Sequence, residues 1–188
     1  MKSMTKRLLA ALLAVAALFA LAGCSKFDKA DAAPKDYTKI LHDARPDEDN
    51  EYYMIFSPGE DGKFTAQYGY SDSYDAAQLD EEIRNMLLPL LNLEEDMYTD
   101  FAASVSGMMV QSYGIAIVKP AEGKQQAVSE ALDAYVQSQM QSMEHYLEDQ
   151  YQIAASSHIS TAPTGEVILV CCENPEAVMN AIKTALAA

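Results

Sequence analysis

The pattern of apolar and polar residues is most informative between residues 106 and 152. An unbroken apolar run at residues 115–118 is followed closely by Pro120. A strand exposed on one face should alternate, so an unbroken run indicates a strand that is central in its sheet or covered on both faces. Pro120 fixes φ and lacks an N–H, so we expect it to end this strand or to open the first turn of the following helix.

Residues 122–152 predict one long helix, because apolar residues recur at spacings of three and four and form a single stripe. A helix of this length would span roughly 45 Å, which is long for a small domain, so a frayed or bent end near Gln139 or Asp149 is compatible with the pattern. The predicted stripe consists of Val128, Ala131, Leu132, Tyr135, Val136, Met140, Met143, Tyr146 and Leu147.

A second unbroken apolar run, residues 167–172, predicts another central strand. The turn signal at residues 162–165 pairs it with a strand at 155–161. Asn174 and Pro175 then have the residue types typical of a helix cap and first position, so a C-terminal helix with an apolar face should follow.

The N-terminal half carries weaker signals. The elements predicted there are a short helix at 37–44 capped by Asp36, a chain break at 46–50, strands at 51–57 and 63–70 around a turn, a polar loop at 71–74, a helix at 76–88, and strands at 98–106 and 108–118. Together the patterns predict an α+β fold, in which a long helix and a C-terminal helix pack on a mostly antiparallel sheet as a two-layer sandwich. We expect one domain over residues 37–188, with an N-terminal extension at 37–89 and a core at 90–188.

The first residues predict export and a lipid anchor. Three basic residues precede an apolar run at 8–21 that is short for a membrane span, a combination typical of a signal peptide. The run ends in Leu21-Ala22-Gly23-Cys24, which resembles the bacterial lipobox. We therefore expect a lipoprotein signal peptide at 1–23, acylation of Cys24 by lipid of the palmitate type, and a flexible tether at 24–36. The alternative is an ordinary signal peptide followed by a chance cysteine.

Charge narrows the possible partners. The 188 residues carry a formal net charge of −15, and removal of the basic signal peptide takes it to −18. Such a charge argues against nucleic acid and against lying flat on an anionic membrane. It permits a cationic partner, although solubility alone would explain it.

The chain contains no familiar catalytic or metal-binding motif. His145 lies beside Glu144 and near Glu148, but one histidine with carboxylates is a thin metal-ligand set, and a solvated helix face is favoured. Residues 47–51 imitate the start of a calcium loop, yet Tyr52 stands where that loop needs glycine, so an acidic surface loop is favoured. We predict no catalytic residue, no metal and no cofactor.

Five tyrosines gather in the predicted hairpin region, namely Tyr52, Tyr53, Tyr68, Tyr70 and Tyr74. Alternation along a strand cannot bury all of them, so they predict a partly exposed patch that could contact a protein, a peptide or a glycan of the cell envelope. The alternative is a set of separate tyrosines, each half-packed on the sheet.

Cys171 and Cys172 are neighbours in the second apolar run. Adjacent side chains of a strand point to opposite faces, and adjacent Cα atoms are closer than a normal disulfide allows. We therefore predict that they do not bond to each other and that both behave as small buried apolar residues.

Several segments together resemble a family of lipoprotein domains of unknown function that is common in Gram-positive anaerobes. The resemblance covers residues 90–186, with a weaker echo at 37–45. The segments that carry it are residues 91–101, 113–124, 144–151 and 165–170, together with the lipobox. The family implies a secreted, membrane-tethered domain and supplies no catalytic residue, cofactor or ligand.

Two functions remain open at this point. The favoured one is a non-catalytic binding or interaction module, lipid-anchored on the extracytoplasmic face of the cell membrane. The alternative is a cell-envelope hydrolase with paired carboxylates as acid and base, which would need one carboxyl group of raised pKa in a cleft. A transporter solute-binding protein is disfavoured, because the mature chain is barely long enough for two lobes.

Overall fold

The computed structural model describes residues 34–188, except residues 60 and 109. Lys35–Ala188 forms one compact unit. The predicted signal peptide at 1–23, the predicted acylation site Cys24 and most of the predicted tether at 24–36 lie outside the described residues. Lys35 and Asp36 at the end of the predicted tether belong to the folded unit, where the Asp36 carboxylate accepts from the Lys39 N–H at 2.9 Å and caps the first described helix.

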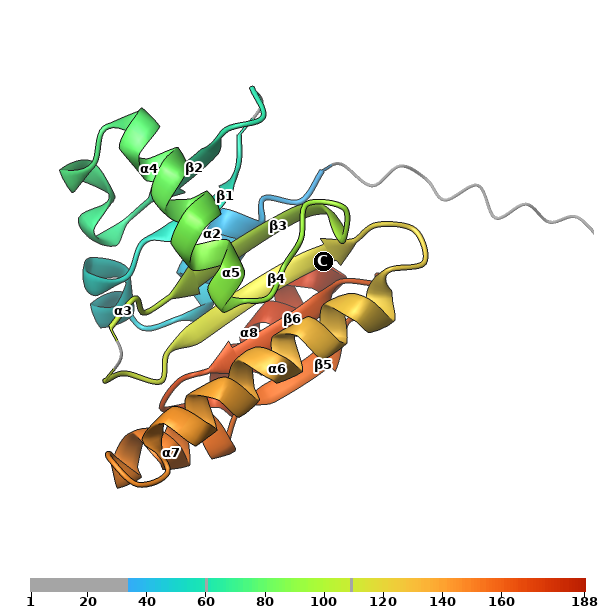
Figure 1. Cartoon of the computed structure of the whole chain (residues 1–188). Coiled ribbons are helices and arrows are strands. Elements are labelled where there is room, and N and C mark those ends of the chain that lie inside the picture. Colours follow the sequence, from blue (N-terminus) through green and yellow to red (C-terminus); the bar gives the residue numbers. More distant parts are fainter. Residues whose placement is uncertain (1–33, 60, 109) are drawn as a thin grey trace, which may run out of the picture. The chain divides into compact units, whose positions relative to one another are not determined.

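The centre of the fold is a six-stranded antiparallel sheet with the strand order β2-β1-β3-β4-β6-β5 (Figure 1). The α+β class and the antiparallel sheet predicted from the sequence are confirmed. The strands are β1 Ile55–Pro58, β2 Phe64–Gln67, β3 Tyr98–Val105, β4 Gly114–Pro120, β5 His158–Thr161 and β6 Val167–Cys171. The two strands with unbroken apolar runs, β4 and β6, pair with each other inside the sheet.

Helices accompany the sheet along most of the chain, and the long helix and the C-terminal helix are both present. The helices are α2 Tyr37–Ala44, α3 Asp47–Tyr52, α4 Ala76–Glu82, α5 Leu88–Leu90, α6 Gln125–Met143, α7 Glu148–Ala155 and α8 Pro175–Ala187. A 3-10 helix covers Gly69–Ser73, and a π-helical turn, Ile83–Leu87, joins α4 to α5.

The sheet is covered on both faces, which differs from the two-layer arrangement expected from the sequence. One core contains Ala116 and Val118 of β4 together with α6, and the other contains Ile115 and Ile117 together with α2 and α8. In Figure 1, α6 lies in front of the sheet and α8 behind it. The unbroken apolar run explains this, because every side chain of β4 from Ile115 to Val118 is fully buried and each face needs a cover.

The predicted helix at 122–152 is two helices, α6 and α7, with a break between Met143 and Glu148. Met143 is the last buried residue of the stripe, whereas Tyr146 is 74% exposed and Leu147 is extended. Nineteen residues of α6 span about 28 Å, and the last of them, Met143, is the last buried residue of the helix. The chain then turns, and α7 packs beside α6.

The region before β1 also differs from expectation. Residues 47–52 form α3 instead of a chain break, and their first turn holds three acidic residues where the helix dipole favours negative charge. The strand predicted from residue 51 therefore begins at Ile55, and its partner ends at Gln67, because Tyr68 has a φ of 66°. Likewise, the strand predicted from residue 108 begins at Gly114.

Two packing details of the inner strands bear on the site. Tyr135 of α6 donates its hydroxyl to the Tyr113 carbonyl at 2.8 Å. A Cβ on Gly114 would lie 2.6 Å from that hydroxyl oxygen, so only glycine lets the helix approach β4 this closely. Cys171 and Cys172 are both buried and unbonded and lie in opposite cores, as predicted.

The first described residues contact the C-terminal end of α8. The Lys35 ammonium donates to the Leu186 carbonyl. The 13 residues of α8 span about 20 Å, so its N-terminal end, at Asn174, lies about that far from the point where the chain enters the folded unit. Within the described residues, no helix combines the length and the apolar character needed to cross a membrane.

Candidate functional site

A pocket of about 300 Å³ lies beside the N-terminal end of α8. Its walls come from α3, the loop before β4, α7 and the segment between β6 and α8. We call it the distal pocket, because α8 separates it from the contact of Lys35 with Leu186. The lining side chains that matter below are Asp49, Tyr53, Ser112, Tyr113, Gln150 and Glu173.

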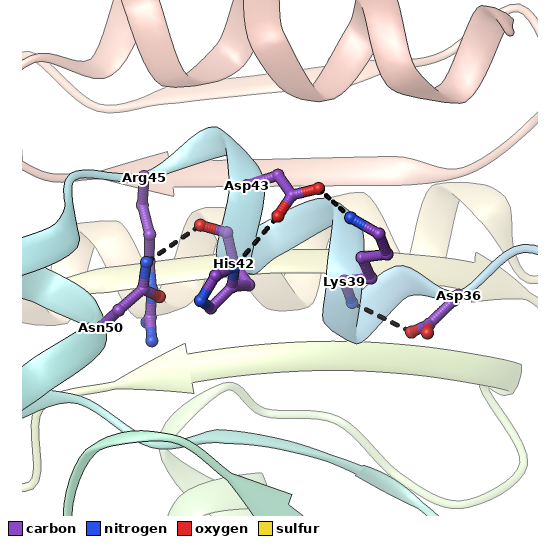
Figure 2. Close-up of polar contacts among 6 residues, drawn as sticks. All are labelled: Asp36, Lys39, His42, Asp43, Arg45 and Asn50. Atoms are coloured by element: carbon purple, nitrogen blue, oxygen red, sulfur yellow. Dashed lines mark hydrogen bonds and ion pairs between the residues drawn. The ribbon is translucent and has the colours of Figure 1, made fainter.

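Arg45 lies behind this pocket and is only 5% exposed. It follows the last residue of α2, and Tyr37, Leu41 and Arg45 recur every four residues, so the helical spacing directs Arg45 to the buried side. The polar contacts that run along α2 to Arg45 and Asn50 are drawn in Figure 2. A buried guanidinium is costly unless its donors are satisfied.

The guanidinium is satisfied by uncharged acceptors. Its Nε donates to Asn50 Oδ1 at 2.6 Å, and its Nη2 donates to the Tyr53 carbonyl at 2.6 Å. Its Nη1 donates to Ser104 Oγ at 2.7 Å and to the Tyr113 hydroxyl at 3.2 Å. No carboxylate of the described residues forms an ion pair with it. Arg45 therefore binds two residues of the pocket wall, through the Tyr53 carbonyl and the Tyr113 hydroxyl, without itself lining the pocket.

Those two tyrosines form a rigid aromatic wall. The rings of Tyr53 and Tyr113 stack with centroids 3.9 Å apart and planes 11° apart. The Tyr53 hydroxyl donates to Gln111 Oε1 at 3.1 Å, and this bond links the segment before β1 to the loop before β4. Burial raises the pKa of the Tyr113 phenol far above its ordinary value, so this hydroxyl stays protonated at physiological pH.

Asp49 is the half-buried acid of the pocket. Loss of water raises the pKa of its carboxyl group, and nearby Glu173 raises it further. The Tyr113 hydroxyl and the Arg45 charge act in the opposite direction on the same pKa. The carboxylate thus faces the pocket in a partly desolvated setting, and no ion pair reaches it from the described part of the chain.

Ser112 is the least satisfied polar group of the pocket. It is 2% exposed, and its N–H donates to Gln150 Oε1 at 2.9 Å. Its hydroxyl has no hydrogen-bond partner among the described residues. Buried hydroxyl groups almost always have a partner, so an unpaired one in a pocket wall points to a group that is supplied from outside.

The pocket lacks the arrangement of a nucleophilic enzyme. No histidine lines it, so Ser112 has no imidazole to accept its proton. Cys172 also lines the pocket, but burial raises the pKa of its thiol to about 11, which keeps it protonated and inert. Across residues 34–188, leaving out 60 and 109, no group of three or more His, Cys, Asp or Glu could hold a metal ion.

The five tyrosines predicted as a patch take different positions. Tyr52 and Tyr70 are exposed, with ring centroids 6.4 Å apart in an edge-on contact. Tyr53 belongs to the distal pocket, Tyr68 packs on the His42 ring at 4.2 Å, and Tyr74 donates to Glu82 at 3.4 Å. The structure therefore places one of the five in the pocket and pairs two on the surface; a binding role for the exposed pair stays a prediction.

Sequence reasoning passed over Arg45, Ser112 and Tyr113 and assigned Asp49 to an acidic surface loop. That assignment is wrong, because Asp49 lies in α3 with its carboxylate half-buried. One signal was available: an arginine in register with the apolar face of an amphipathic helix. His145 and its neighbours Glu144 and Glu148 are exposed, as predicted, but Glu144 and His145 lie in the turn between α6 and α7, so the three residues do not share a helix face.

Comparisons with known proteins identify the family. Residues 71–172, more than half of the chain, match the family model described as "Domain of unknown function (DUF4358)". No curated protein matches the chain, and no solved structure does. The predicted resemblance to a family of domains of unknown function is thereby confirmed at that level. The matched region runs from before α4 to the end of β6, and the chain belongs to the DUF4358 family.

Proposed function

We propose that this protein is a ligand-binding module held by a lipid on Cys24 at the extracytoplasmic face of the cell membrane. It acts by binding, without catalysis, and its binding site is the distal pocket. The pocket carries the proposal through one observation: Ser112, a residue of the pocket wall, has the one buried side-chain oxygen or nitrogen of the described residues that lacks a hydrogen-bond partner. A ligand that completes this hydrogen bond recovers the cost of burying the hydroxyl.

The position of the pocket suits a tethered receptor. Residues 25–34 can extend to roughly 35 Å from an acylated Cys24. The folded unit begins beside Leu186, and the pocket lies about 20 Å away, at the other end of α8. The pocket therefore lies at the end of α8 opposite to the residues that enter the folded unit.

Photocrosslinking in the native envelope tests the binding role. A p-benzoylphenylalanine replaces Asn174, an exposed and uncharged residue of the pocket lining, in the full chain. The matched control carries the same group at Glu130, an exposed position of α6 outside the pocket. We expect defined products from position 174 that position 130 does not give. Identical products from both positions, or none from position 174, would overturn the proposal.

The second candidate is a cell-envelope hydrolase. It is favoured by one observation, namely that Asp49 has a raised pKa and shares its pocket with Glu173. These two carboxyl groups would serve as acid and base. The purified full chain, incubated with cell-wall polymer, would then release soluble fragments, and D49N would abolish the release. We expect no release from either protein.

A further inference from the structure

We propose that the distal pocket binds a primary ammonium group on a small organic molecule, with Asp49 as its counter-ion. This inference rests on the proposed function, in which the pocket is the binding site, and assigns the chemistry of the ligand. It follows from the charge of the walls, the unpaired state of Asp49, the unpartnered Ser112 hydroxyl and the size of the pocket.

The charge of the walls selects a cation. Three carboxyl groups line the pocket, those of Glu48, Asp49 and Glu173, and no lysine, arginine or histidine does. Arg45 is the nearest buried cation, but it lies behind Tyr113 and its donors already bond to uncharged acceptors. An anion entering the pocket would therefore meet repulsion without a compensating donor of positive charge.

Asp49 has the features of a carboxylate that binds a cation from outside the protein. Its carboxylate is half-buried, yet no lysine or arginine of the described residues pairs with it. A partly desolvated carboxylate gains more from a direct cation than an exposed one, because water no longer screens the pair. Exposed acids elsewhere, such as Asp96 with Lys124, already have their partner on this chain.

Ser112 provides the second, independent sign of a ligand. Its hydroxyl is buried, lies on a residue of the pocket wall and has no partner among the described residues. An ammonium group carries three donors in different directions and needs acceptors besides its counter-ion. The Ser112 oxygen is such an acceptor on a pocket residue, and Gln150 Oε1, which accepts only the Ser112 N–H among the described residues, has room for a second donor.

The size of the pocket limits the rest of the molecule. A volume of about 300 Å³ corresponds to roughly ten water molecules at about 30 Å³ each. This is the lower end of the range of small-molecule sites, and it suits an amine with a short aliphatic stem. The stacked Tyr53 and Tyr113 rings offer that stem an aromatic wall. Such an amine could be a free diamine or the side chain of a lysine in a peptide.

Titration of the full chain in detergent micelles tests the proposal. The probes are 1,5-diaminopentane, capped lysine (Nα-acetyl-lysine methylamide) and its uncharged analogue, capped norleucine. We expect one or both amines to bind, with shifts of the Ser112 and Tyr113 amide signals in NMR, and capped norleucine not to bind. Binding of the diamine alone would indicate a free amine as the ligand, and binding of capped lysine a peptide side chain.

Two matched variants locate the counter-ion. D49N should weaken amine binding about tenfold or more, which is the usual effect of losing a charge-assisted hydrogen bond. D133N, which removes an exposed carboxylate on α6, should leave the affinity within about twofold. Thermal unfolding of both variants checks that they fold. Unchanged amine binding by D49N, or an equal loss in D133N, would overturn the proposal.

The outcomes separate this inference from the proposed function. If capped norleucine shifts the same amide signals as the amines, the pocket is a binding site but not one for ammonium. If no probe shifts the Ser112 and Tyr113 signals, the ammonium assignment fails. The crosslinking from position 174 still decides the binding role in either case, because it leaves the three carboxyl groups in place and does not depend on the chemistry of the ligand.

Discussion

Replacement of Arg45 by methionine should destabilise the protein strongly, although the two side chains have similar length. The guanidinium is 5% exposed and makes hydrogen bonds with four acceptors. Hydrogen bonds of a charged donor contribute about 1.5–3 kcal/mol each, but methionine also avoids the cost of burying a charge. The two effects must be weighed acceptor by acceptor.

Two of the four acceptor residues lose little by the change. Ser104 Oγ still donates to the Met54 carbonyl at 2.8 Å. Asn50 Oδ1 loses its donor, but the residue is half-buried, so water can replace the guanidinium there, and its Nδ2 still donates to the His42 carbonyl at 3.0 Å. The Tyr53 carbonyl and the Tyr113 hydroxyl lose the hydrogen bond that Arg45 donates to them. Two poorly satisfied buried groups at about 1–3 kcal/mol each give a net loss of roughly 3 kcal/mol in the free energy of unfolding.

Urea denaturation followed by circular dichroism measures this loss. With a slope of about 2 kcal/mol per molar urea, a loss of roughly 3 kcal/mol lowers the midpoint by about 1.5 M. The control is Lys39→Met on the same helix, whose side chain is exposed, and its midpoint should stay that of the parent. Arg45→Lys should be intermediate, since an ammonium lacks the planar fork. A shift below about 0.3 M for Arg45→Met would refute the argument that this residue holds the pocket wall.

Three further substitutions and one labelling experiment test other parts of the structure. Asp49→Asn should raise the urea midpoint at pH 7. The pKa of the Asp49 carboxyl group in the folded protein lies above the ordinary value of 3.8, so its ionisation lowers the stability of the parent protein as pH rises through that interval. At pH 3 the urea midpoints of the parent and the variant should no longer differ. Leu132→Ala, at a fully buried site, should cost about 2–5 kcal/mol in the same assay, and an unchanged midpoint would mean that α6 is packed differently. Gly114→Ala should cost about 1–3 kcal/mol, because the new methyl group meets the hydroxyl end of the neighbouring tyrosine; a gain in stability would contradict this contact. Cys171 and Cys172 should react slowly with a thiol reagent when folded and fast in denaturant without reductant, whereas a need for reductant would reveal a disulfide.

The apolar pattern predicted the centre of the fold because the forces there are local and periodic. The unbroken runs at 115–118 and 167–172 identified β4 and β6 as inner strands, and the stripe from Val128 to Met143 identified the buried side of α6. The same runs also implied covers on both faces of the sheet. The predicted two-layer arrangement placed the helices on one face of the sheet and did not apply that consequence.

The boundaries and the site were harder to predict, because they depend on distant contacts. The break between Met143 and Glu148 falls inside a continuous helical pattern, so that pattern did not predict it. The distal pocket joins Asp49, Ser112, Gln150 and Glu173 from four separate segments, and each is an ordinary polar residue in its own stretch. Only Arg45 carried a local sign, since its spacing from Leu41 places it on the buried side of α2.

Native mass spectrometry of the full protein, extracted gently from its own membrane, tests the central claim most directly. The account predicts a chain that begins at Cys24 and carries a diacylglyceryl lipid, with an additional small adduct that dissociates on activation. The adduct should be absent from the Asp49→Asn protein prepared in parallel and present in the Asp133→Asn protein. A chain without lipid would contradict the anchor. Equal spectra for the parent and Asp49→Asn proteins, with or without an adduct, would contradict a ligand held by the distal pocket through Asp49.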